Sequence, residues 1–217
     1  MFSNPAHDVP VSSETDEIYQ VAPDVYGWSR YDRSVKADLS STALLTSRGL
    51  LLIDPIALQR TALEKLTAQL TVGGVVLTNE NHERDAAAFA QKFSAPIFAL
   101  SRASASPDSL SITPVDDGDK LTDDLTVIAI PGAGAGEMAL HFDSGGGTVV
   151  MGDALINFEP HGFGFLPAKY CSDSKQLRTS LLKLLDYSFE RMLFAHGTPI
   201  ASGASARLKT LLQGELR

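Results

Sequence analysis

The sequence predicts an α/β protein in which two β-sheets pack face to face and helices cover their outer sides. Two observations support this fold class. Short apolar runs alternate with helical segments along the chain, and both halves, which are similar in length, combine hairpins with strand–helix units. The chain of 217 residues is long enough for a sizeable core. We expect a polar tail over residues 1–16 and a single domain over residues 17–217.

The first half is predicted to run strand, hairpin, helix, strand, helix, strand. Residues 17–28 form a strand with a turn at Pro23-Asp24, and residues 39–55 contain two apolar runs joined at Ser47-Arg48-Gly49. Residues 61–70 place three leucines on one helical face. A buried strand over residues 75–78, a helix with Ala86, Phe89 and Phe93 on one face, and a strand over residues 95–100 follow.

The second half repeats this mixture of elements. A buried strand over residues 125–131 precedes a hairpin of residues 137–143 and 147–153, which turns at a glycine-rich segment. Leucines recur at helical spacing over residues 174–187, with Ser172 or Ser174 as the N-cap. The chain closes with a strand over residues 191–197 and a helix over residues 203–212.

Composition excludes several classes of protein. The formal charge of −8 and the lack of a basic cluster argue against nucleic-acid binding. The N-terminus lacks the pattern of a signal peptide, and the longest apolar run, residues 49–58, is too short to span a bilayer. The one cysteine, Cys171, cannot form an internal disulfide. We therefore expect a cytoplasmic protein without a membrane partner, acting on a small molecule, and we leave a homo-oligomer open.

The segment over residues 74–93 has the outline of a metal site, since a buried strand leads through a short polar turn into a helix. The turn carries Asn79, Asn81, Glu83 and Arg84. Asn79 or Asn81 can also cap the helix, and acidic residues favour its positive end. His82 is predicted to be an exposed surface histidine.

Four segments in order resemble the metallo-β-lactamase family. They are "GLLLIDP", which resembles the family's early strand ending in an aspartate, here Asp54, "VVLTNENHERDAAAF" where the family has Thr-His-x-His-x-Asp-His, "AIPGAGAGEMALHFDSGGGTVVMGDAL" where it has Pro-Gly-His and Gly-Asp-Ala, and "LFAHGTPI" where it has Gly-His-Gly. By order of elements the resemblance covers about residues 17–213. It implies a four-layer αββα sandwich with a site along one edge of the two sheets.

The resemblance also implies which ligands of a two-zinc centre remain. The first-site histidines fall on Asn79, Asn81 and Ala133, which are poor ligands or lack a donor atom. In the second site, the family's aspartate falls on Glu83 and its histidine on Arg84. The bridging aspartate and the last histidine are present as Asp153 and His196.

Arg84 is the informative difference, because a guanidinium has no acceptor atom and cannot bind zinc. We expect Arg84 to form an ion pair with Asp153 in place of the metal. On this hypothesis the protein has lost the dinuclear centre, needs no cofactor and binds a small molecule or partner at the old cleft without hydrolysis. The first alternative is a hydrolase with one zinc, iron or manganese ion on Glu83, Asp153 and His196. The second is a structural or oligomeric subunit.

Other residues near the same edge are candidates for a binding pocket. Trp28, Arg30 and Lys169 combine aromatic and cationic side chains, which suit either an anionic or planar ligand or a contact that holds a loop to the sheet. His141 alternates with Leu140 and Phe142 and is predicted to face solvent. The glycine-rich "PGAGAG" lacks the spacing of a dinucleotide-binding loop.

Overall fold

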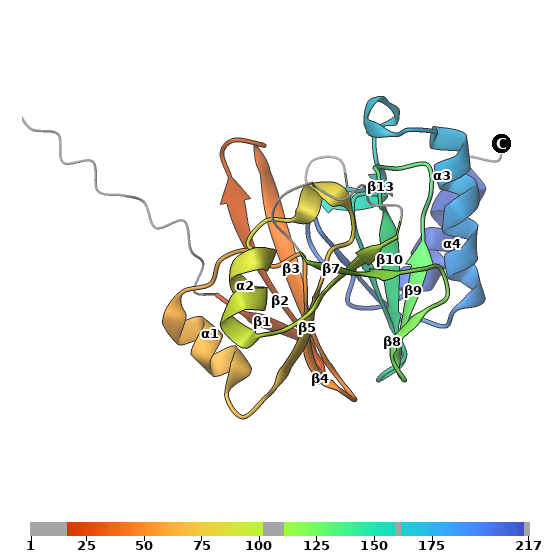
Figure 1. The fold of residues 1–217 in the computed structure, drawn as a ribbon. Coiled ribbons are helices and arrows are strands. Elements are labelled where there is room, and N and C mark those ends of the chain that lie inside the picture. The colour runs from red at the N-terminus through yellow and green to blue at the C-terminus, as the bar shows by residue number, and fades with distance from the viewer. Residues whose placement is uncertain (1–16, 102–110, 159–161, 215–217) are drawn as a thin grey trace, which may run out of the picture.

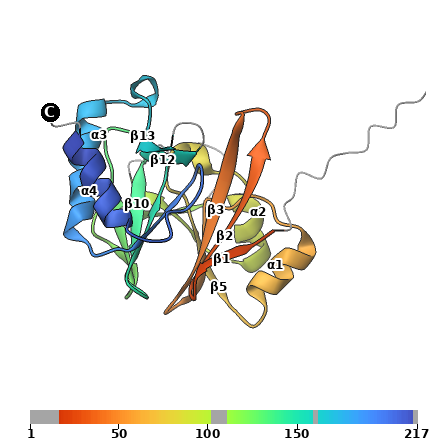
Figure 2. The same cartoon turned by 180° about the vertical axis from the view of Figure 1, so that it is seen from behind.

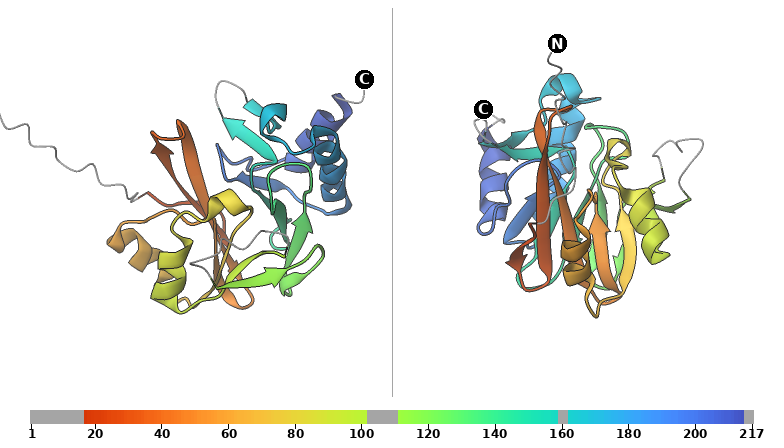
Figure 3. Two further views of the ribbon diagram at one scale, coloured as in Figure 1. Left: turned by 45° about the horizontal axis from the view of Figure 1, so that its top comes forward. Right: turned by 90° about the vertical axis from the view of Figure 1, so that its left-hand side faces the viewer.

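The structure is a computed structural model that describes residues 17–101, 111–158 and 162–214 (Figure 1). The predicted tail, residues 1–16, lies outside the described residues. Two mixed sheets pack against each other and carry helices on their outer faces, as Figures 2 and 3 show from behind, from above and from the side. The predicted αββα sandwich is confirmed.

The first sheet has seven strands in sequence order. They are β1 (Tyr19–Ala22), β2 (Val25–Asp32), β3 (Ala37–Thr46), β4 (Gly49–Ile53), β5 (Val72–Val76), β6 (Ile97–Leu100) and β7 (Ile112–Val115). The first three pairings are antiparallel, and the last three, from β4 to β7, are parallel. The predicted hairpin of β3 and β4 is confirmed.

The second sheet has five strands in the order β14-β11-β10-β9-β8. Their bounds are β8 (Lys120–Thr122), β9 (Leu125–Ala129), β10 (Met138–Phe142), β11 (Thr148–Met151) and β14 (Arg191–Phe194). The predicted hairpin of β10 and β11 is present, and β11 pairs in parallel with β14. Strands β7 and β8 and a separate ribbon of β12 (Leu155–Phe158) and β13 (Gly162–Phe165) were not predicted from the sequence.

The helices cover the two outer faces, as predicted from their apolar spacing. Helices α1 (Arg60–Thr67) and α2 (Ala86–Phe93) pack on the first sheet, and α3 (Ser174–Leu181) and α4 (Ala204–Gly214) on the second. Three short 3₁₀ helices are η1 (Glu80–His82), η2 (Ala168–Tyr170) and η3 (Leu182–Asp186). Helix α3 is capped by Asp173, which accepts from the backbone N–H of Lys175 and Gln176, and not by the predicted serines.

Three apolar clusters correspond to the three interfaces between layers. One lies between α1, α2 and the first sheet, one between the sheets, and one between the second sheet and α3 and α4. This layering is why the side chains of β10 and β11 are buried. Among the described residues, no helix is both long enough and apolar enough to cross a membrane.

Candidate metal centre

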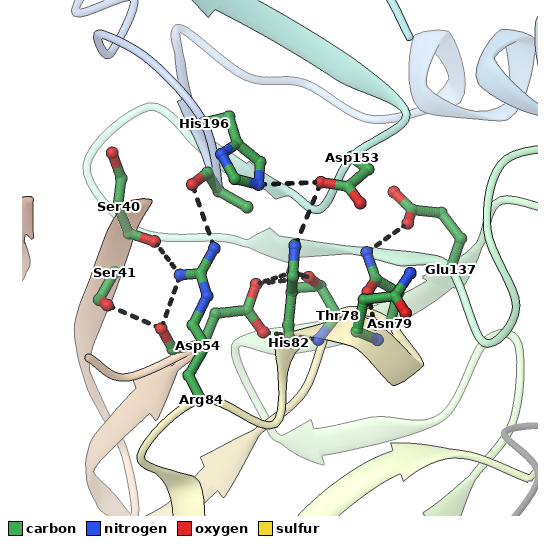
Figure 4. Close-up of polar contacts among 12 residues, drawn as sticks. Ser40, Ser41, Asp54, Thr78, Asn79, His82, Arg84, Glu137, Asp153 and His196 are labelled. Carbon is green, nitrogen blue, oxygen red and sulfur yellow. Dashed lines mark hydrogen bonds and ion pairs between the residues drawn. The ribbon is translucent and has the colours of Figure 1, made fainter. Parts of the chain in front are cut away.

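Polar side chains meet where parallel strands end at one edge of the sandwich (Figure 4). Asp54 follows β4, and the turn from Thr78 to Arg84 follows β5. Asp153 follows β11, and His196 follows β14. Because β4 and β5 are parallel, and so are β11 and β14, each sheet delivers both of its loops to the same edge.

The centre of the site is an aspartate between two histidines. His82 Nε2 lies 3.2 Å from Asp153 Oδ1, and His196 Nε2 lies 3.3 Å from the same oxygen. In the described part of the chain, these three residues form the one group whose ligand-type atoms all lie within 4.8 Å of one another. His82 is buried, with 3% of its surface exposed. The prediction that His82 faces solvent is therefore wrong.

The other ring nitrogen of each histidine is held by an acceptor. His196 Nδ1 lies 2.9 Å from the carbonyl oxygen of Asp38. A carbonyl only accepts, so Nδ1 of His196 carries a proton. His82 Nδ1 lies 2.9 Å from Asp54 Oδ2 and donates to that carboxylate. When the imidazoles of His82 and His196 are both neutral, each carries its proton on Nδ1. Their Nε2 atoms then direct lone pairs toward Asp153.

The backbone conformation and hydrogen bonds of Asp54 hold its carboxylate where it orients His82. Its backbone has φ +47°, a left-handed conformation that costs an aspartate energy and occurs often at functional sites. Its carboxylate accepts from the Thr78 backbone N–H at 2.8 Å and from the Thr78 hydroxyl. Burial acts to raise the pKa of Asp54, but His82, the charge of Arg84 and the hydrogen bond from Thr78 together outweigh it and lower the pKa. Asp54 is thus an anion that fixes the His82 ring.

The electrostatics of the site favour positive charge between the ligand atoms. Burial acts to lower the pKa of His82, but Asp54 and Asp153 outweigh burial and raise it to about 9. For Asp153, burial acts to raise the pKa, and hydrogen bonds from His196 and His82 lower it far below its ordinary value. In the absence of a metal ion, a proton on the His82 imidazole therefore supplies the positive charge that the Asp153 carboxylate favours.

The three donor atoms suit a transition-metal ion. Zinc binds imidazole nitrogen and carboxylate oxygen at about 2.0–2.1 Å, so neighbouring ligand atoms in a tetrahedron lie roughly 3.3 Å apart. The distances from Asp153 Oδ1 to Nε2 of His82 and of His196, 3.2 and 3.3 Å, match this separation between ligand atoms. Histidine ligands are usually oriented by a carboxylate or carbonyl on the second nitrogen, and Asp54 and the Asp38 carbonyl do so here.

The ligand set predicted for a single metal, Glu83 with Asp153 and His196, differs in one member from the group that the structure brings together, which has His82 in place of Glu83. Glu83 is half-buried and adopts a helical conformation directly after η1, and it does not belong to the three-residue group. The 3₁₀ turn points His82, the preceding residue, into the site instead. Glu83 was predicted as a ligand because the family resemblance aligns it with an aspartate ligand of the family.

Arg84 also differs from its prediction. Within the described residues it makes no ion pair with Asp153. Its Nη1 donates to the carbonyls of Ser40 at 2.6 Å and Asp54 at 2.9 Å, and Nη2 to that of Ala195 at 3.3 Å. The guanidinium therefore joins β3, the end of β4 and the end of β14. It links the two halves as expected, but through backbone carbonyls.

The three residues aligned with the family's first zinc site have other partners and surroundings. Asn79 is buried and caps η1, accepting from the Asn81 backbone N–H at 2.9 Å. The prediction that Asn79 or Asn81 caps the following helix is wrong, because α2 begins after Asp85 and has no side-chain cap hydrogen bond. The Asn81 side chain is exposed. Ala133 is fully buried in the core beside α3, where Gly132, with φ +107°, lets that helix approach.

Glu137, which lies beside the cluster and is 2% exposed, was not predicted from the sequence. One carboxylate oxygen accepts from the Ala154 backbone N–H at 2.8 Å, and the other from Asn79 Nδ2 at 2.9 Å. Burial and the charge of Asp153 raise the pKa of Glu137 to about 8. The available signal was an acidic residue directly before β10, whose five residues are all buried.

The candidate pocket residues are scattered. Trp28 is fully buried and donates its indole N–H to the Ile56 carbonyl at 3.0 Å, so its prediction as a pocket residue is wrong. Arg30 is half-buried, and its charge acts on Arg84. Lys169 is exposed, with its amine 4.6 Å from the centre of the Tyr170 ring. His141, predicted to be on the surface, is 7% exposed and contacts the Ser188 carbonyl.

A cavity of about 430 Å³ lies beside the segment that supports His196. It is lined by residues of β1, β2, β3 and the loop after β14, namely Tyr19, Gln20, Val21, Ser29, Asp38, Ser40, Gly197, Thr198, Pro199 and Ala201. Its lining is mixed, with apolar groups beside several hydroxyl groups and the Asp38 side chain.

Residues 19–214 match the family model of the metallo-β-lactamase superfamily. Similar solved structures include the DIM-1 metallo-β-lactamase (14% identity, 92% of this chain and 97% of that chain, TM-score 0.71). Others are a metallo-β-lactamase from Pontibacter korlensis (13%, 91% and 98%, 0.69) and a metallo-β-lactamase family protein from Thermus thermophilus (18%, 91% and 81%, 0.64). No match was found among curated proteins.

Proposed function

Because this chain belongs to the metallo-β-lactamase superfamily, we propose that it is a hydrolase that uses a single metal ion. His82, Asp153 and His196 would hold the ion, which is zinc, iron or manganese. Three protein ligands with an open position are typical of catalytic zinc sites. On this proposal the dinuclear centre expected from the family resemblance is lost, because Asn79, Asn81 and Ala133 supply no first site.

One observation carries this proposal: both imidazoles are oriented by acceptors on Nδ1 and present Nε2 to the same carboxylate oxygen. Two neutral histidines would otherwise place lone pairs against an anion, which is unfavourable without a cation or a proton. Orientation through the second ring nitrogen is also what metal-ligating histidines usually show.

The bound ion would supply an activated water near neutral pH. The residues of this chain would bind and orient. Asp54 keeps the proton of His82 on Nδ1, and the Asp38 carbonyl does the same for His196. Arg84 holds the strand ends that carry the site together. The substrate class is an ester, a thioester or a similar acyl bond.

The test is hydrolysis of p-nitrophenyl esters and a chromogenic thioester by chelator-treated protein reloaded with Zn²⁺, Fe²⁺ or Mn²⁺. We expect hydrolysis that requires the metal and is lost in Asp153→Asn. The matched control is Glu83→Gln, which makes the same carboxylate-to-amide change outside the cluster and should keep the activity. Hydrolysis that chelators do not affect, or no hydrolysis with any ion, would contradict the proposal.

The second candidate is a binding protein without hydrolytic activity, and two observations favour it. A protonated His82, whose pKa is raised to about 9, can fill the place of the ion. The cavity of about 430 Å³ beside His196 can take a small molecule. Metal-independent binding of a ligand, together with sub-stoichiometric metal in the purified protein, would favour this candidate over the hydrolase. A purely structural subunit would show neither activity nor ligand binding.

A further inference from the structure

Glu137 and Asn79 connect the two turns that carry His82 and Asp153. Glu137 stands directly before β10, and Asn79 directly before η1. Their side chains meet through the 2.9 Å hydrogen bond from Asn79 Nδ2 to Glu137 Oε2 (Figure 4). The two residues are each 2% exposed.

On one side, Glu137 fixes the turn of Asp153. Its Oε1 accepts from the backbone N–H of Ala154, the next residue after the ligand. Gly152, on the other side of Asp153, makes this approach possible: a Cβ there would lie 2.7 Å from Glu137 Oε1. The carboxyl group is therefore packed closely under the turn.

On the other side, Asn79 fixes the turn of His82. Its Oδ1 accepts from the Asn81 backbone N–H, which starts the 3₁₀ helix that ends at His82. The Asn79 side chain thus uses its oxygen for its own turn and its nitrogen for Glu137. A continuous chain of hydrogen bonds runs from the Asp153 turn to the His82 turn.

We propose that Glu137 and Asn79 are positioning residues that set His82 against Asp153 for metal binding. The inference rests on the proposed function and assigns the residues that hold its site in place. In this role, a hydrogen-bonded side-chain pair links the two turns at the position where the family resemblance would place the first metal ion.

A purely apolar contact would stabilise this interior at lower cost. A buried carboxyl group carries a desolvation penalty, and here burial and Asp153 raise the pKa of Glu137 to about 8. Directional hydrogen bonds fix the separation and angle of two turns, which apolar packing does less strictly. Partners that orient metal ligands in this way are typical of metal sites.

The test measures binding of Co²⁺ by calorimetry and by its visible absorption, with thermal unfolding as the check on folding. Glu137→Gln keeps the size of the side chain and an oxygen for Ala154, but it brings an amide nitrogen against Asn79 Nδ2. We expect cobalt affinity to fall by about tenfold or more, the range found for partners of metal ligands. Glu83→Gln is the matched control and should bind as the parent does.

The rescue is the double variant Glu137→Gln with Asn79→Asp, which reverses the polarity of the hydrogen bond. The amide introduced at position 137 can then donate to the carboxylate introduced at position 79, so most of the cobalt affinity and the parent's absorption spectrum should return. If Glu137→Gln does not fold, Asn79→Ser takes its place, because serine keeps the cap and loses the donor to Glu137. It should lower the affinity in the same way.

The outcomes separate this inference from the proposed function. If the parent binds Co²⁺ and folded Glu137→Gln binds it equally well, or if the double variant stays as weak as the single one, the positioning role is wrong and the metal site stands. If Asn79→Ser binds as the parent does, the role is wrong as well. A parent that binds no Co²⁺ would overturn both.

Discussion

Replacing Arg84 with methionine should lower the free energy of unfolding by about 3 kcal/mol. The guanidinium donates three hydrogen bonds to backbone carbonyls, from Nη1 to Ser40 and Asp54 and from Nη2 to Ala195. Methionine has a similar length but no donor, so all three bonds are lost. The two halves of the sandwich then lose a cross-link beside the site.

The size of this loss in unfolding free energy depends on which hydrogen bonds each of the three carbonyls keeps in Arg84→Met. The Asp54 carbonyl still accepts from the Ser41 hydroxyl, and the Ala195 carbonyl from the Ser40 backbone N–H. Only the Ser40 carbonyl loses every hydrogen bond made within the described residues. Bonds to a charged group contribute about 1.5–3 kcal/mol each, and part of this sum is offset because a half-buried charge is no longer desolvated.

Thermal and urea unfolding measure the effect, and for a chain of this size 3 kcal/mol corresponds to a melting temperature lower by roughly 6–12 °C. Arg60→Met is the matched control, since Arg60 pairs with Glu64 on an exposed helix surface and should change stability by less than about 0.5 kcal/mol. If Arg84→Met melted within about 2 °C of the parent, the cross-link would contribute little and our reasoning would be wrong.

Three further predictions concern neighbouring positions. Between about pH 4.5 and 8, the stability of Glu137→Gln relative to the parent should rise by about 1.4 kcal/mol per pH unit. The reason is that the raised pKa of Glu137, about 8, favours the neutral acid in the folded parent, so the parent loses stability as the pH rises through this range. Unfolding at several pH values measures the difference in stability, and a difference that does not change with pH contradicts the prediction. Gly152→Ala should cost about 1–3 kcal/mol and weaken cobalt binding, since the added Cβ meets Glu137; calorimetry that finds parent affinity refutes it. Arg84→His should bind no second metal and gain no hydrolysis, because Asn79 and Ala133 remain in place; a second equivalent of bound zinc would contradict this.

Apolar spacing was sufficient to predict most of the fold. Helix α3 follows directly from helical spacing, and β10 from its short apolar run, although alternation along β10 led to the wrong prediction that His141 faces solvent. The ribbon of β12 and β13 and the short β7 and β8 were missed because they are short and partly exposed, and such segments lack a clear period.

The site was predicted only in part. Asp153 and His196 follow strand ends and could be identified from the resemblance, whereas His82 could not, because its direction depends on the 3₁₀ path of η1. Glu137 was missed because its partners, Asn79 and Ala154, lie 58 and 17 residues away along the chain. Arg84 was identified, but its partners are backbone carbonyls, which the sequence does not display.

Crystals grown with Zn²⁺ and measured at the zinc absorption edge offer the most direct test of the single-metal site. We expect one anomalous peak per chain, in contact with His82 Nε2, Asp153 Oδ1 and His196 Nε2. Two peaks, a peak bound by Glu83, or no peak in this group at saturating zinc would contradict the account.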